Sequence, residues 1–113
     1  MGGNLSGIWS ALVTVAGGGT DVALADPGDG YAYKIYGLNV SVVTAGAGDS
    51  FSLQDVTGRV MQVVPGDLTG IYEIDFGNSG SELTTHASEA LNAVQTGTTA
   101  VYKLRVKYRK VTA

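Results

Sequence analysis

Residues 101–109 read VYKLRVKYR, and from Tyr102 onward aromatic or apolar side chains alternate with basic ones without a break. The basic side chains of the stretch are Lys103, Arg105, Lys107 and Arg109. The side chains between them are Tyr102, Leu104, Val106 and Tyr108. A repeat of two residues places the two sets on opposite faces of a β-strand. The stretch therefore predicts a strand with one apolar face for a core and one cationic face.

Charge is distributed unevenly along the rest of the chain. Five of the seven Lys and Arg residues lie between positions 103 and 110, and all ten Asp and Glu residues precede position 90. The formal net charge of −3 argues against a general nucleic-acid binder, which needs a cationic surface. No run approaches about 18 apolar residues, and the first 20 residues contain no Lys or Arg. We therefore expect neither a membrane span nor a secretory signal.

Length and composition indicate one all-β domain. A chain of 113 residues is close to the commonest domain size. Charged residues make up 15%, below the usual share of about 25%, and the chain has 17 Gly. This balance favours short strands joined by tight turns. Cysteine is absent, which excludes a disulfide framework, thiol catalysis and a zinc–thiolate site.

Alternating or apolar segments recur along the chain, and turn residues separate them. We expect strands over residues 8–15, 20–24, 31–44, 50–55, 59–64, 69–76 and 88–95, and a last strand at the C-terminal stretch. Turn signals every 8–12 residues predict an antiparallel β-sandwich, specifically a jelly roll of about eight strands. We expect residues 1–10 to form a Gly-rich N-terminal arm and residues 11–113 to form a single jelly-roll domain.

The inward positions of these strands predict the core. The expected core residues are Leu12, Leu38, Val40, Val42, Phe51, Leu53, Val60, Val63, Tyr72, Ile74, Phe76, Leu91, Leu104 and Val106.

No motif in the chain predicts a reaction centre. His86 is the only histidine, no second histidine is present to chelate a metal with it, and no Gly-x-Ser-x-Gly elbow is present. The acidic segment 26–30 reads DPGDG, which favours a Pro-Gly turn over a calcium loop. The sequence therefore predicts a protein that is not an enzyme, with no catalytic residues, no cofactor and no metal site.

Several segments resemble those of small virion structural proteins of tailed bacteriophages. The segments that carry the resemblance are KIYGL at 34–38, SFSL at 50–53, GIYEIDFG at 70–77, SEALNAV at 88–94 and VYKLRVKY at 101–108. The resemblance covers about two-thirds of the chain. It implies a single jelly-roll domain, often a homotrimer, that decorates or cements a capsid or sits in a tail or baseplate. It implies no catalytic residues.

The leading prediction is therefore a capsid decoration (cement) protein on the virion surface, with the major capsid protein or another virion protein as its partner. The residues predicted to lie at the interface are Trp9, Lys103, Arg105, Lys107 and Arg109. A single Trp is a good anchor for an interface, and a cationic strand face suits an acidic partner.

Two other interpretations of the cationic stretch stay open at this point. The basic side chains could protect a sheet edge, or they could pair with Glu73 and Asp75 on a neighbouring strand. The second functional class is a tail, baseplate or receptor-binding module that binds carbohydrate. Its candidate stacking residues, besides Trp9, are Tyr31, Tyr33, Tyr36 and Tyr108.

Overall fold

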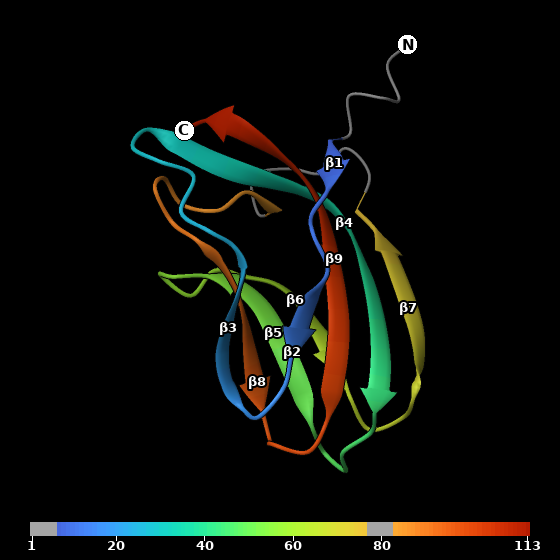
Figure 1. Cartoon of the computed structure of the whole chain (residues 1–113). Coiled ribbons are helices and arrows are strands. Elements are labelled where there is room, and N and C mark those ends of the chain that lie inside the picture. Colours follow the sequence, from blue (N-terminus) through green and yellow to red (C-terminus); the bar gives the residue numbers. More distant parts are fainter. Residues whose placement is uncertain (1–6, 77–82) are drawn as a thin grey trace.

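The computed structural model describes residues 7–76 and 83–113, which form a two-layered β-structure (Figure 1). The strands are β1 (Ile8–Trp9), β2 (Val13–Val15), β3 (Gly19–Leu24), β4 (Tyr31–Thr44), β5 (Ser50–Asp55), β6 (Val60–Pro65), β7 (Gly70–Asp75), β8 (Leu91–Thr96) and β9 (Val101–Thr112). Among the described residues, no helix is long and apolar enough to cross a membrane.

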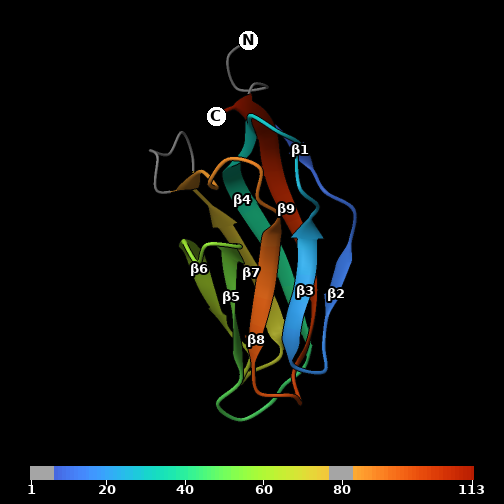
Figure 2. The ribbon, with the colours of Figure 1, turned by 90° about the vertical axis from the view of Figure 1, so that its left-hand side faces the viewer.

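The strands form two antiparallel sheets that pack as a sandwich. Sheet A has the order β1/β2-β9-β4-β7, and sheet B has the order β3-β8-β5-β6. Figure 2 views the sandwich from the side of sheet B. The predicted all-β antiparallel sandwich is confirmed.

The strand order is that of a jelly roll. Because β1 and β2 pair with successive parts of β9, they share one position, and the described strands fill eight positions. From β2 onward, every connection crosses from one sheet to the other except the hairpin between β5 and β6. Two interlocked Greek keys produce this alternation.

The two longest strands form the centre of sheet A. β4 and β9 pair from Tyr31↔Thr112 to Thr44↔Val101, with bulges near Gly37 and near Thr44. The alternation predicted for β9 is present, since Tyr102, Leu104 and Val106 are buried and the basic side chains face outward.

The core lies between the sheets and contains most of the predicted residues. Eight of them are buried: Leu38, Val40, Val42, Phe51, Leu53, Leu91, Leu104 and Val106. Three on β7 or just after it are partly buried and pack against the core: Tyr72, Ile74 and Phe76. The rings of Phe51 and Tyr102 meet edge to face with centroids 4.8 Å apart, which joins the two sheets.

Three predicted core residues are wrong. Val60 and Val63 on β6 are 50% and 52% exposed, while Met61 and Val64 are buried. The register explains this, because Leu53 pairs with Gln62 while Gln54 pairs with Val60, so β6 has one residue more than β5. Such a bulge shifts the inward phase along the strand.

The third wrong core residue, Leu12, is 54% exposed because the expected strand 8–15 is divided. Between β1 and β2, the Ser10 N–H donates to the Val106 carbonyl at 2.8 Å, and the Val106 N–H donates to Ser10 Oγ at 2.9 Å. The hydroxyl takes the place of a backbone acceptor, and Leu12 lies outside the ladder. Residues 8 and 9 of the expected arm pair with β9, and residues 1–6 lie outside the described part.

The strand expected over residues 88–95 begins later, as β8, at Leu91. Ser88 has a φ of 62°, which lies in the left-handed region and cannot continue a strand. Residues 77–82, between the strands expected over 69–76 and 88–95, lie outside the described part, and Thr84 bridges to Lys34 on β4.

Candidate functional site

Most of the residues predicted to lie at an interface are on the outer face of sheet A. We call it the charged face, and it consists of Trp9, Leu12, Gly37, Asn39, Ser41, Ile71, Glu73, Asp75, Lys103, Arg105 and Lys107. Arg109 follows on β9 as an exposed residue but does not line the depressions described below.

Backbone pairing aligns residues of the charged face across β9, β4 and β7. We call each set of three residues aligned in this way a rank. The central rank places Arg105 of β9 beside Asn39 of β4, and Asn39 beside Glu73 of β7. In the next rank, Gly37 lies between Lys107 and Asp75. Each rank therefore has a cation on β9, a small side chain on β4 and a carboxylate on β7.

A third rank completes the pattern at the other end of the face. Ser41 of β4 lies between Lys103 of β9 and Ile71 of β7. This rank has a cation on one side and an apolar side chain, 72% exposed, on the other.

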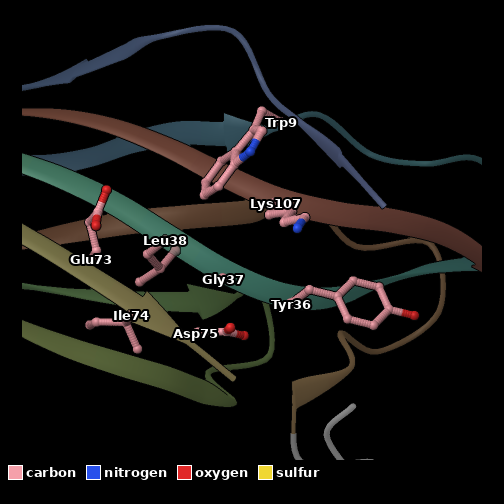
Figure 3. A pocket seen from close by; sticks show the side chains of 8 residues that line it. All are labelled: Trp9, Tyr36, Gly37, Leu38, Glu73, Ile74, Asp75 and Lys107. Atoms are coloured by element: carbon pink, nitrogen blue, oxygen red, sulfur yellow. The ribbon is translucent and has the colours of Figure 1, made fainter. Parts of the chain in front are cut away.

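Small side chains on β4 leave the middle of the charged face low. Two shallow depressions of about 370 and 440 Å³ lie there, and both are lined by Trp9 and Glu73. At Gly37 the absence of a side chain is required, because a Cβ would lie 2.9 Å from the Ile74 carbonyl oxygen. Figure 3 shows the first depression, with Lys107 and Asp75 on opposite sides of Gly37.

Trp9 stands at the margin of these depressions. β1 holds it there through its pairing with Lys107, and the indole is 47% exposed. The Lys107 Nζ lies 5.8 Å from the centre of the Trp9 ring, within the range of a cation–π contact. Trp9 therefore combines an exposed apolar ring with a fixed position.

The cations of the charged face have no carboxylate partner among the described residues. Lys103 Nζ donates to Thr14 Oγ1 at 2.7 Å, and Lys107 contacts Trp9. Arg105 is exposed, and among the described residues it forms no ion pair. These side chains are thus available to an external acidic group.

For Glu73, the interpretation that it pairs with the β9 cations is wrong, since no ion pair between them is formed among the described residues. β4 lies between β9 and β7, so the two rows are two strand spacings apart, about 9.5 Å. Glu73 Oε2 instead accepts a hydrogen bond from Asn39 Nδ2 at 3.0 Å. The sheet-edge interpretation of the cations also fails, because β1 and β2 cover the outer edge of β9.

Two of the tyrosines nominated for sugar stacking are unavailable. Tyr33 and Tyr36 are only 8% and 5% exposed. Tyr108 is half-buried and meets the Tyr33 ring edge to face. Tyr31 is exposed, but Lys110 Nζ lies 4.5 Å from its ring centre. Alternation alone cannot distinguish a stacking ring from a core ring.

A second polar cluster surrounds Asp55, a buried carboxylate at the end of β5. Its Oδ1 accepts from the backbone N–H groups of Gly58 and Arg59 at 3.0 and 2.8 Å. Its Oδ2 accepts from the His86 N–H at 2.9 Å and contacts His86 Nδ1 at 2.7 Å. Burial raises the pKa of Asp55, but these hydrogen bonds outweigh burial and bring its pKa below the ordinary value.

The other ring nitrogen of His86 defines what this cluster can do. Arg59 Nη2 lies 3.0 Å from His86 Nε2, and a guanidinium only donates, so Nε2 accepts and Nδ1 carries the proton. Both ring nitrogens of His86, for which the sequence predicted no role, therefore have a hydrogen-bond partner.

Asp55, His86 and Glu89 offer ligand atoms within 4.8 Å of one another. However, Glu89 accepts from the Thr57 N–H at 2.7 Å, and the Arg59 guanidinium adds a positive charge beside the imidazole. These contacts tie the segment after residue 83 to the turn between β5 and β6. The arrangement suits a structural latch better than a cation site.

Comparisons with protein-family models, with curated proteins and with solved structures found no match to this chain.

Proposed function

We propose that the chain is a non-enzymatic structural protein of a bacteriophage virion, a decoration (cement) protein that binds the capsid surface and stabilises it. The observation that supports this proposal is the charged face, where an exposed Trp9 stands beside three cations that no described carboxylate neutralises. Such a surface suits attachment to an acidic protein surface in the assembled particle.

Attachment of this kind needs no chemistry from the protein. A ligand that binds only the assembled shell stabilises it by mass action, whatever the ligand's own activity. Contacts repeated over many copies add up to strong attachment even when each is modest. Copies that also bind one another would multiply the contacts in this way.

The test is an attachment assay with purified virions. The variant K103Q/R105Q/K107Q removes the three cations of the charged face, and K110Q is the control because Lys110 pairs with Tyr33 and lies on the other side of β9. We expect the triple variant to lose occupancy and the salt dependence of binding, and the control to attach like the wild type. Full occupancy of the triple variant would refute the assignment of this surface.

A carbohydrate-binding module is the second candidate, and the position of Trp9 favours it. The exposed indole borders depressions that also contain Glu73 and Asn39, and aromatic rings with polar groups around them suit a sugar. Trp9 is the only tryptophan in the chain, so its fluorescence reports on the site directly. A change in Trp9 emission with oligosaccharides from a glycan array would support this function, and an empty array would exclude the glycans tested.

A further inference from the structure

We infer that the charged face binds the same face of a second copy of this chain, about a two-fold axis that runs along β4. The cations on β9 of one copy then meet Glu73 and Asp75 on β7 of the other. The inference rests on the proposed function insofar as that function makes the charged face the docking surface. It adds the identity of the partner and the symmetry of the contact.

The first observation is that the charged face contains its own complement. Arg105 and Glu73 lie in the same rank, on opposite sides of Asn39. The next rank repeats this order with Lys107 and Asp75 around Gly37. The cationic and acidic rows are therefore parallel, equally long over these ranks, and equidistant from β4.

The second step is the symmetry operation that brings the two rows together. Consider a two-fold axis that lies between the two faces and runs parallel to β4. It places the β9 side of one copy over the β7 side of the other, and each rank stays at the same height along the strands. The partner's β9 then lies over β7, so Arg105 of one copy faces Glu73 of the other. The same operation places Lys107 over Asp75. Two sheets packed face to face lie about 10 Å apart, a gap that long side chains from both faces can fill.

The symmetry also excludes the obvious competing arrangement. A two-fold axis across the strands would place β9 over β9 and hence cations over cations. Like charges held opposite each other oppose association, so this pairing is disfavoured. Only the axis along β4 places Arg105 over Glu73 and Lys107 over Asp75 in both copies, as an isologous contact requires.

Shape and apolar surface fit the same pairing. The outward side chains of β4 are short, namely Gly37, Asn39 and Ser41, so two β4 strands can approach along the axis. Ile71 is 72% exposed and lies in the same rank as Lys103. In the dimer, the aliphatic part of Lys103 from the second copy would cover Ile71. Trp9 would extend past the edge of the partner's β7.

The test is a charge-reversal cycle on the central rank, read by the solution mass. We expect the wild type to reach twice the 11.6 kDa of the chain in a concentration series by sedimentation or light scattering. Glu73→Arg and Arg105→Glu should each weaken the dimer by about 10- to 100-fold, because each change places like charges in contact twice. The double variant E73R/R105E should recover most of the wild-type affinity. Asp29→Arg, an exposed charge reversal in the turn before β4, should leave the dimer unchanged.

Each result has a defined consequence. A wild type that stays monomeric at every concentration, or forms a trimer, overturns the two-fold contact. A double variant that is no tighter than either single variant overturns the Arg105–Glu73 pairing. The same proteins are also tested for attachment to virions. If E73R attaches like the wild type while K103Q/R105Q/K107Q does not, the proposed function stands and the partner assignment fails. Full attachment of the triple variant refutes the proposed function, whatever the mass.

Discussion

Removal of the Asp55 carboxylate tests whether the latch between the β5–β6 turn and the segment after residue 83 stabilises the fold. The side chain is buried and accepts four hydrogen bonds, two on each oxygen. Hydrogen bonds to a charged group contribute about 1.5–3 kcal/mol each, but losses within one network do not add. We therefore expect Asp55→Ala to lower the free energy of unfolding by about 4 kcal/mol, near the upper end for a single substitution.

Asp55→Asn is the sharper variant because it preserves the shape. Its amide oxygen can still accept from Gly58 and Arg59, but its NH₂ group then faces the two donors of His86. Two bonds and the charge are lost, so we expect a loss of about 3 kcal/mol.

The assay for both variants is urea unfolding followed by Trp9 fluorescence and circular dichroism. Asp29→Asn, an exposed acid in a turn, is the control and should stay within about 0.5 kcal/mol of the wild type. An Asp55→Asn protein as stable as this control would refute the account of the latch.

Three further predictions concern pH, close packing and the phase of β6. Because folding lowers the pKa of Asp55, the ionised carboxylate stabilises the fold above about pH 4, and this stabilisation is lost as the pH falls through the folded pKa. The free energy of unfolding of Asp55→Asn should therefore change less with pH in this acid range than that of the wild type. Gly66→Ala should destabilise the fold by about 2 kcal/mol or more in thermal unfolding, since its Cβ would lie 2.0 Å from the hydroxyl oxygen of the fully buried Tyr102; a melting temperature like that of the wild type would contradict this packing. Val64→Ala should cost about 2 kcal/mol in urea unfolding and Val63→Ala less than about 0.5, and equal losses would contradict the placement of Val64 in the core and Val63 on the surface.

Local pattern in the sequence determined the elements and most of the core. The period of two in residues 101–109 is a property of the strand itself, so Leu104 and Val106 were correctly placed inside and Arg105 outside. Turn residues likewise placed the β5–β6 hairpin and the start of β4. The prediction of which β6 side chains face the core was wrong for Val63. The bulge in β6 depends on how β6 pairs with β5, which the residues of β6 alone do not specify.

Only the tertiary structure decided which strands are neighbours, and the charged face depends on that choice. Nothing in the residues themselves states that β4 separates Arg105 from Glu73, or that β1 brings Trp9 to Lys107. The Asp55–His86 contact spans 31 residues and arises in the same way. Alternation fixes the side of a strand on which a residue lies, whereas its neighbours across the sheet come from burying all the strands together in one sandwich.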